Sequence, residues 1–207
     1  SLILSYFVGA LVMLINTLIG LPMAVLIARR RAGSLPSTAL DVIVNIPLIV
    51  PSIALGVSMK FFWSNFAFIP EIVLLIFAHL SITYPYFVRA MASAIERISM
   101  DLEEASRILG ARPFTLFRTI ILPLTKYSLF AGALLVFTRS VDETGATSAV
   151  VSKLQTAPVL LVAWVKGKVT PIPTASEIGL GIGFLVLLSF AVLLVMRLVV
   201  RGKERRY

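Results

Sequence analysis

The sequence contains no cysteine and few charged side chains. The absence of cysteine excludes disulfide bonds and thiolate metal sites. Charged residues make up 14% of the 207 residues, whereas a soluble globular protein has roughly 25%. The hydrophobic share is 58% and the mean hydropathy is +0.98, which is too high for a chain folded in water. Composition therefore predicts a protein embedded in a membrane.

The sequence also lacks the common signatures of catalysis. Its one histidine, His79, has no second histidine and no well-placed acid beside it, so we expect a packed helix-interface residue rather than a proton relay or ligand. No H-E-x-x-H or G-x-S-x-G pattern occurs, which argues against an intramembrane hydrolase. The G-x-x-x-x-G-K-[S/T] loop for ATP is missing as well. We expect a non-catalytic chain with no cofactor and no metal site.

Long apolar runs divide the chain into five predicted spans. At ~1.5 Å per residue, a helix needs about 20 apolar residues to cross a ~30 Å hydrocarbon core. The second run contains Pro47 and Pro51, which predict either a kinked packing helix or a broken helix beside a substrate path. We therefore expect a single all-α domain over 1–207, a polytopic membrane helix bundle. The runs are about 1–28, 38–63, 71–91, 119–139 and 174–198.

The connecting segments carry weaker signals. Residues 150–169 mix lysines with apolar side chains and predict a short amphipathic or partly re-entrant segment. Thr174 and Glu177 have the spacing of a capping box, so the last helix should begin near Thr174. An interfacial aromatic belt is expected around the turn at 64–70, from Phe61, Phe62, Trp63, Phe66 and Phe68.

The basic residues indicate the orientation. They gather at 29–31, at 89–118 and in the tail at 201–206, and five spans place these clusters on one side. The positive-inside rule makes that side cytoplasmic, C-terminus included. The net charge of +9 is therefore a topology signal, and we expect no nucleic-acid partner. The start of the chain then lies outside, which is consistent with a missing upstream helix.

Between the third and fourth spans lies a charged, helix-competent segment. Ser99 or Asp101 can cap its first turn, where acidic side chains suit the helix dipole. Gly110 suits a left-handed C-terminal position, and Pro113 prevents the helix from continuing. The residues alone predict either an ordinary interfacial loop helix or a helix whose side chains face another protein.

This segment resembles the EAA signature of ABC importer permeases. That signature places Glu-Ala-Ala, then Gly, then Ile-x-Leu-Pro at fixed offsets. Here the offsets are met by Glu104-Ala105-Ser106, by Gly110 and by Ile120-Ile121-Leu122-Pro123. Ser106 replaces the second alanine, which is a small-for-small change. A membrane scaffold or assembly protein without transport activity would explain the spans but not this spaced signature.

The resemblance extends to most of the chain. Five spans in this orientation are similar to the type I, methionine-permease-like fold. Residues 47–56 resemble the same helix in polyamine, ferric-iron and oxyanion permeases. Residues 137–147 look like the end of the fourth core span in the molybdate, sulfate and iron group, although Thr144 stands where an aromatic residue is common.

The resemblance implies a permease subunit of a binding-protein-dependent importer in the cytoplasmic membrane. Its implied partners besides lipid are two separate ATPase subunits, which bind ATP and Mg²⁺, a second permease copy or paralogue, and an extracytoplasmic substrate-binding protein. The segment at 101–113 would dock on an ATPase as a coupling helix. Small size at Ala105 and Gly110 would permit close approach, and Glu104 would contact the ATPase or cap its own helix. The implied coupling residues are Glu103, Glu104, Ala105, Ser106, Arg107, Gly110 and Pro113.

Polar residues within or near the spans are candidates for the substrate path. Each of them is explained either by helix packing or by substrate contact: Asn45, Ser52, Ser58, Thr83 and Tyr84. Arg139, Asp142 and Glu143 lie near the outer face, where they form either a local ion pair or cap, or an outer gate or docking contact. The substrate class stays open among small polar solutes: oxyanions, ferric iron, polyamines, thiamine and sugars. The identity of the second permease, including a fused half, is open as well.

Overall fold

The computed structural model describes residues 1–30, 33–64, 69–168 and 173–204, and every regular element in these ranges is helical. By length and composition, four helical segments of the described residues can cross a membrane, or five if a bent helix pair is counted as one span. The predicted all-α membrane bundle is therefore confirmed. The elements are α1 (Leu2–Ala28), α2 (Ser34–Ile49), α3 (Ser52–Trp63), α4 (Glu71–Glu96), α5 (Met100–Ile108), α6 (Pro113–Leu116), η1 (Phe117–Ile121), α7 (Leu122–Val141), α8 (Gly145–Val150), α9 (Ala157–Val165) and α10 (Ala175–Glu204).

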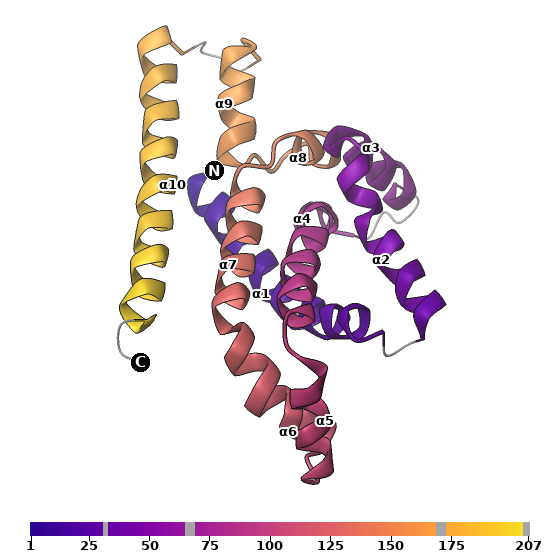
Figure 1. Cartoon of the computed structure of the whole chain (residues 1–207). Helices are drawn as coiled ribbons and strands as arrows, with labels where there is room; N and C mark the ends of the chain where they lie inside the picture. Colours follow the sequence, from indigo (N-terminus) through magenta and orange to yellow (C-terminus); the bar gives the residue numbers. More distant parts are fainter. Residues whose placement is uncertain (31–32, 65–68, 169–172, 205–207) are drawn as a thin grey trace.

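The core is a three-helix unit of α1, α4 and α7 (Figure 1). Phe87 of α4 is fully buried, and its ring lies against Gly20 of α1 and Gly132 of α7. A Cβ atom at Gly20 would come within 2.6 Å of that ring, so the glycine is what lets the helices approach. Small residues at helix interfaces are typical of membrane bundles, where close packing supplies much of the association energy.

The second span is broken rather than kinked. The direction of the chain bends by 106° between α2 and α3, at Val50 and Pro51. Val50 has an extended backbone with ψ 131°, because the proline ring that follows disfavours helical geometry at the preceding residue. The span also begins at Ser34, one turn earlier than the sequence predicts. The helix is therefore broken, and its position beside a substrate path stays a prediction.

Helix α3 packs against the short helix α8. Gly56 of α3 lies against the backbone of Ala146, and a Cβ atom at Gly56 would be 2.7 Å from the Cα and the carbonyl oxygen of Ala146. In the opposite direction, Gly145 of α8 lies against the Ser52 side chain. Two reciprocal glycine contacts thus join α3 and α8 into one packed unit.

The fourth span is longer than the sequence predicts. It runs from Pro113 to Val141 and includes the π-helical turn η1. The widened turn is closed by a hydrogen bond from the Leu122 amide to the Phe117 carbonyl. Pro123 follows at once and has no amide hydrogen to donate, so the local change of helix type falls where a regular α-helical ladder would be interrupted.

The last helix, α10, stands at the side of the bundle and contacts α7 and α9 (Figure 1). Its start has the predicted capping box, because the Thr174 amide donates to Glu177 Oε2 at 2.8 Å and the Glu177 amide donates to Thr174 Oγ1 at 3.4 Å. The segment at 150–169 contains the short helix α9, which ends at Val165. Parts of the predicted aromatic belt and basic clusters lie outside the described residues: Arg31, Phe66, Phe68, Arg205 and Arg206.

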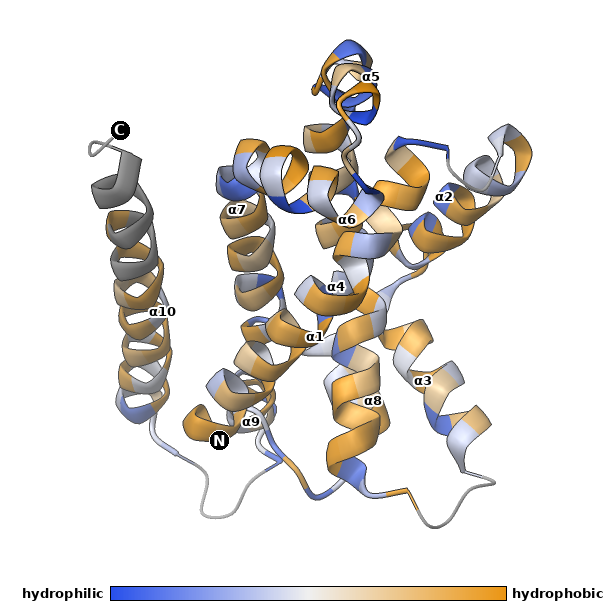
Figure 2. Cartoon of the chain, turned by 90° about the horizontal axis from the view of Figure 1, so that it is seen from below, coloured by the Kyte–Doolittle hydropathy of each residue, from blue (hydrophilic) through white to orange (hydrophobic). Residues whose placement is uncertain are grey.

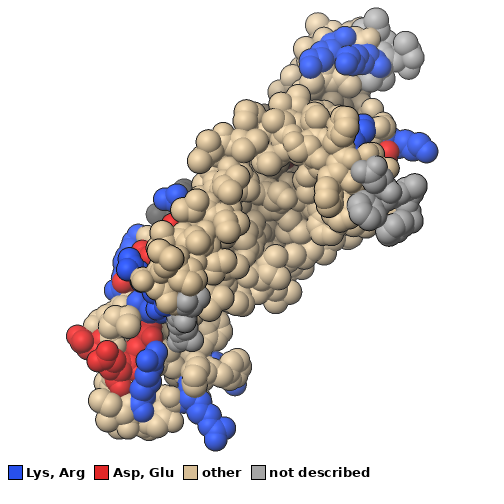
Figure 3. All heavy atoms as spheres, turned by 90° about the vertical axis from the view of Figure 1, so that its right-hand side faces the viewer, with Lys and Arg blue, Asp and Glu red and all other residues tan. Residues whose placement is uncertain are grey.

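The distribution of charge follows the predicted spans. In the view of Figure 3, charged side chains gather at the two ends of the molecule, and a wide uncharged and hollowed belt lies between them. The helices of that belt are mainly hydrophobic, whereas α5, at one extreme end, mixes polar and apolar residues (Figure 2). The bundle thus has one apolar zone with α5 projecting beyond it.

We predict that Gly56→Ala destabilises the fold by about 1–3 kcal/mol, because the added methyl group meets backbone atoms that cannot rotate away. Gly183→Ala in α10 is the matched control, since a Cβ atom there meets nothing within 4 Å. Thermal unfolding of the purified variants in detergent measures both. Equal midpoints for the two variants would contradict the close packing of α3 on α8.

Candidate functional site

Helix α5 is a short helix with both ends closed. The Ser99 side chain accepts a hydrogen bond from the Asp101 amide at 3.2 Å, so Ser99 is the cap. At the other end, the Ala111 amide donates to the Ser106 carbonyl and the Gly110 amide to the Arg107 carbonyl, at 3.0 and 2.9 Å. This is a Schellman motif, which needs the left-handed backbone seen at Gly110, where φ is +85°. The predicted ends of this helix are confirmed.

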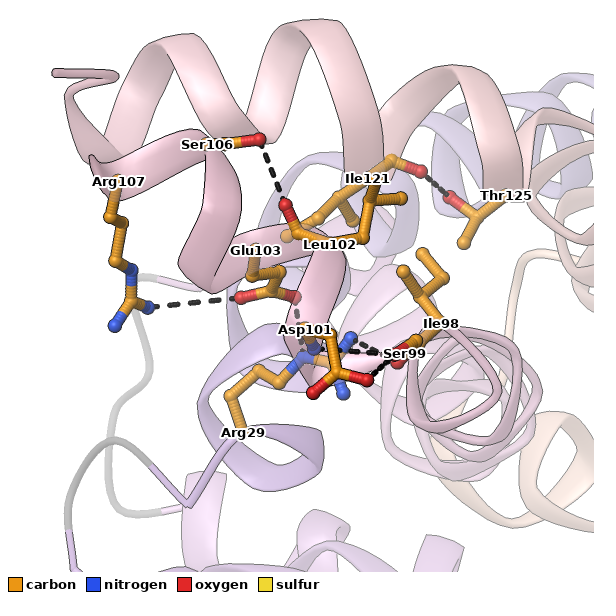
Figure 4. Close-up of polar contacts among 10 residues, drawn as sticks. All are labelled: Arg29, Ile98, Ser99, Asp101, Leu102, Glu103, Ser106, Arg107, Ile121 and Thr125. Carbon is orange, nitrogen blue, oxygen red and sulfur yellow. Dashed lines mark hydrogen bonds and ion pairs between the residues drawn. The ribbon is translucent and has the colours of Figure 1, made fainter. Parts of the chain in front are cut away.

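Glu103 holds α5 against the end of α1 (Figure 4). Its Oε1 accepts a hydrogen bond from Arg29 Nε at 2.7 Å, and the two side chains are 1% and 5% exposed. Arg29 also donates to the Ile98 carbonyl at 3.0 Å, just before α5 begins. Arg107 lies 3.7 Å from the second carboxylate oxygen but is 55% exposed, so its contribution is small. Glu103 is thus buried inside the molecule.

The rest of α5 is open to the surroundings. Glu104, Ala105 and Gly110 are exposed, and nothing lies within 4 Å of a Cβ atom built at Gly110. Ser106 is half-buried and its hydroxyl donates to the Leu102 carbonyl at 2.9 Å. The apolar side chains Ile108 and Leu109, at the C-terminal end of α5, are 86% and 87% exposed. Helix α5 itself projects at one end of the molecule (Figure 2). A helix that combines exposed apolar and charged residues in this way is typical of a protein-binding surface.

The segment after α5 leads directly into the membrane bundle. Pro113 occupies the first turn of α6, where its missing amide hydrogen costs nothing. Leu116 and Ile121 are buried in the main core, so α6 and η1 are anchored. Thr125, two residues after Pro123, then donates to the Ile121 carbonyl at 2.7 Å. A displacement of α5 would therefore reach α7 through short, packed elements.

A buried polar chain crosses the centre of the bundle. His79 of α4 makes hydrogen bonds to Ser140 Oγ of α7 at 2.7 Å and to Thr147 Oγ1 of α8 at 2.8 Å. Asn16 of α1 donates to Thr83 Oγ1 at 2.8 Å, and that hydroxyl donates to the His79 carbonyl at 2.6 Å. His79 is thus confirmed as a packed residue that joins three helices. Within the described ranges, no group of His, Asp and Glu is arranged as a metal site.

The residues predicted near the outer face form a local structure. Glu143 is 2% exposed and accepts a hydrogen bond from the Ala146 amide at 2.9 Å, at the start of α8. Arg139 lies 3.3 Å from its other oxygen, one helical turn away. Asp142 is exposed at the end of α7. The ion pair and cap are therefore present, and a role in gating or docking stays a prediction.

The predicted path residues occupy different environments. Thr83 is fully buried in the polar chain, whereas Ser58 is exposed on α3 and Tyr84 is half-buried on α4. Ser52 begins α3, directly after the helix break. Asn45 on α2 donates to Asp41 and accepts from Arg89 at 3.4 Å. The structure places these residues along α2, α3 and α4, and their contact with a substrate stays a prediction.

Sequence reasoning missed Arg29 as a functional residue. It belongs to a basic cluster that we interpreted only as a topology signal. Its partner Glu103 is 74 positions away, so no local spacing could reveal the pair. Glu103 lies on the same short helix as exposed residues, so the sequence did not indicate that its side chain is buried either.

Comparison with known proteins gives a consistent result. A family model described as "Binding-protein-dependent transport system inner membrane component" matches residues 16–205. The molybdenum transport system permease protein ModB of Escherichia coli (strain K12) is 34% identical over 170 residues, covering 74% of this chain and 72% of ModB. The spermidine/putrescine transport system permease protein PotC of the same strain is 30% identical over 166 residues, covering 80% of this chain and 57% of PotC.

A solved structure shares the fold over nearly the whole chain. It is described as inward facing conformations of the MetNI methionine ABC transporter, and it aligns with a TM-score of 0.73. The alignment covers 97% of this chain and 95% of that chain, at 23% sequence identity. At this identity the match shows the shared fold alone.

We predict that Arg29→Gln destabilises the protein by about 3–5 kcal/mol, because it leaves the buried Glu103 carboxylate without its partner. The control Arg107→Gln should cost less than about 1 kcal/mol, since Arg107 is half in solvent. Thermal unfolding, together with limited proteolysis of the 99–113 segment, measures both effects. Similar results for the two variants would show that the Arg29 pair does not hold α5.

Proposed function

The chain belongs to the family of binding-protein-dependent transport system inner membrane components, and from this premise we propose that α5 is the helix through which separate ATPase subunits move its membrane bundle. The chain is a multi-pass inner-membrane permease subunit of an ABC importer, and it is non-catalytic. Permeases of this family assemble with ATPase subunits and a binding protein. The observation that carries the proposal is the position of α5, beyond the apolar zone and open on one side.

The contacts of α5 suit the transmission of force. Its exposed face, with Glu104, Ala105 and Gly110, is available to a partner. Its opposite side is fixed to α1 by the Arg29–Glu103 pair and leads through α6 into α7. A helix that transmits force must be rigid, and the hydrogen-bonded caps at both ends of α5 limit its flexibility. Movement of a docked ATPase would then displace two core helices together.

The orientation follows from the same proposal. Helix α5 and the end of α1 face the cytoplasm, where the ATPases bind ATP and Mg²⁺, and this chain binds no nucleotide itself. The opposite end, with α8, α9 and the start of α10, faces the extracytoplasmic binding protein. At this end, the basic residue Arg139 and the acidic residue Asp142 are candidates for contact with the binding protein.

The substrate path is proposed to run beside α2 and α3. Several large apolar side chains on these helices are exposed, among them Ile49 at 85% and Ile53 at 56%, so lipid or a second subunit can cover them. A second permease copy or a paralogue is the proposed cover. The path between the two subunits would then pass the helix break beside Ser52.

The transported substrate is proposed to be a small polar solute. Two relatives named for molybdenum and for spermidine/putrescine transport resemble this chain to a similar degree, at 34% and 30% identity. Their substrates carry opposite charges, so sequence similarity alone does not choose between them. Oxyanions and polyamines are both retained, together with ferric iron, thiamine and sugars.

We predict that Gly110→Asp lowers substrate uptake at least tenfold while the chain still inserts and folds, because a charged side chain at the exposed tip obstructs close approach of the ATPase. Uptake and ATP hydrolysis by the reconstituted complex are the measurements. Gly167→Asp is a matched control, since Gly167 also has a left-handed backbone, with φ +64°, and open space around it, but lies at the end of α9.

Two results would contradict the assignment of α5. One is native uptake by the Gly110→Asp complex at native expression. The other is an equal loss with Gly167→Asp, which would indicate a general effect of backbone strain. Loss of co-purification with the ATPase in the first variant alone would support direct docking.

A further inference from the structure

A polar cavity of about 480 Å³ lies between the end of α1, the start of α2 and the second half of α4. It is found at the same end of the molecule as α5, because its lining residue Arg30 follows Arg29, which binds Glu103. The other polar residues used below are Ser37, Asp41, Arg89, Ser93 and Glu96. Its position at the edge of the apolar zone places it where a membrane headgroup or a solute from the aqueous phase can enter.

Two guanidinium groups line this cavity without a carboxylate partner. The ion pairs within the described residues involve Arg29, Arg107 and Arg139, and neither Arg30 nor Arg89 takes part in one. Arg89 makes a long hydrogen bond, 3.4 Å, to Asn45 Oδ1. Both guanidinium groups are exposed and keep N–H donors for an acceptor-rich ligand, in a cavity that also holds the carboxylates of Asp41 and Glu96.

Ser37 supplies an independent observation. Its residue is 2% exposed, it lines the cavity, and its hydroxyl has no hydrogen-bond partner among the described residues. Buried hydroxyl groups are nearly always paired, so an unpaired one beside a cavity indicates a ligand or ordered water. Ser93, one turn beyond Arg89, lines the same cavity and can donate as well.

The two carboxylates of the cavity do not cancel its donor character. Asp41 Oδ1 already accepts a hydrogen bond from Asn45 Nδ2 at 2.9 Å. The second oxygen of Asp41 and the carboxylate of Glu96 are the remaining acceptors. The donors are two guanidinium groups and the hydroxyl groups of Ser37 and Ser93, since the Thr38 hydroxyl already donates to the Ser34 carbonyl. Each guanidinium carries five N–H donors in a planar fork. Donors are in excess, and the complementary ligand is rich in acceptor oxygens.

We propose that this cavity binds a tetrahedral oxyanion, held by Arg30 and Arg89 with Ser37 completing the shell. Such an oxyanion can be either the phosphate group of a membrane lipid or a free oxyanion in the aqueous phase. The proposal concerns binding alone and does not depend on transport or on ATPase docking, so a failed uptake assay leaves it unaffected.

The test measures both sources on the full chain. Native mass spectrometry after release from nanodiscs of phosphatidylglycerol and phosphatidylcholine measures retained phospholipid. Isothermal titration of the chain in lipid-free detergent with molybdate, and separately with inorganic phosphate, measures the free anion. Arg89→Gln should weaken the bound species at least tenfold, and Ser37→Ala by about two- to tenfold, as expected for charged and neutral hydrogen bonds.

Control variants distinguish binding in the cavity from a general effect of the net charge of the chain. Arg118→Gln removes one exposed charge that is not part of the cavity lining and should leave binding unchanged. Glu96→Gln removes the repulsive carboxylate and should strengthen oxyanion binding. Response in the nanodisc arm alone identifies a lipid phosphate, and response in the titration arm identifies a free oxyanion.

Three outcomes would overturn the proposal. The first is no effect of Arg89→Gln and Ser37→Ala in either arm. The second is an equal effect of Arg118→Gln. The third is binding of spermidine that Glu96→Gln weakens, which would make the cavity a cation site.

Discussion

The buried contact between Arg29 and Glu103 is the interaction on which the functional interpretation depends. A nine-residue polar helix has little core of its own, and isolated helices of this length are unstable in water. The ion pair, with the additional bond from Arg29 to the Ile98 carbonyl, attaches this helix to the end of a long membrane helix. Because both side chains are almost fully buried, the attachment is not weakened by salt as a surface pair would be.

The bundle shows the same design in its interior. Hydrophobic burial does not drive helix association in lipid, so the helices need close contacts and hydrogen bonds. Glycine at positions 20, 56 and 132 supplies the contacts, and the chain from Asn16 through Thr83 to His79 supplies the bonds. His79 extends these hydrogen bonds to α7 and α8, so the short helix α8 is tied to the same core that carries α5.

The sequence predicted the features that depend on neighbouring residues, and it did not predict those that depend on contacts between distant helices. The apolar runs, the Ser99 cap, the Gly110 turn and the Thr174 capping box depend on neighbouring residues and could be predicted. The Arg29–Glu103 pair, the enclosure of Thr83 and the cavity beside Ser37 depend on how distant helices pack, which no spacing records. The fourth span exceeds the predicted bounds because helical structure continues from Pro113 through the π-helical turn to Val141. The break at Pro51 was predictable in part, because the two prolines indicate that the helix is interrupted but do not determine the angle of the bend.

The break at Val50 and Pro51 has an electrostatic consequence. The end of α2 and the start of α3 leave carbonyl and amide groups without partners inside their own helices, with partial negative and positive charge respectively. Hydrocarbon chains cannot solvate such groups, so this point must be covered by protein or reached by water. A position of this kind, within a long apolar segment, presents a fixed backbone dipole to whatever fills the adjoining space.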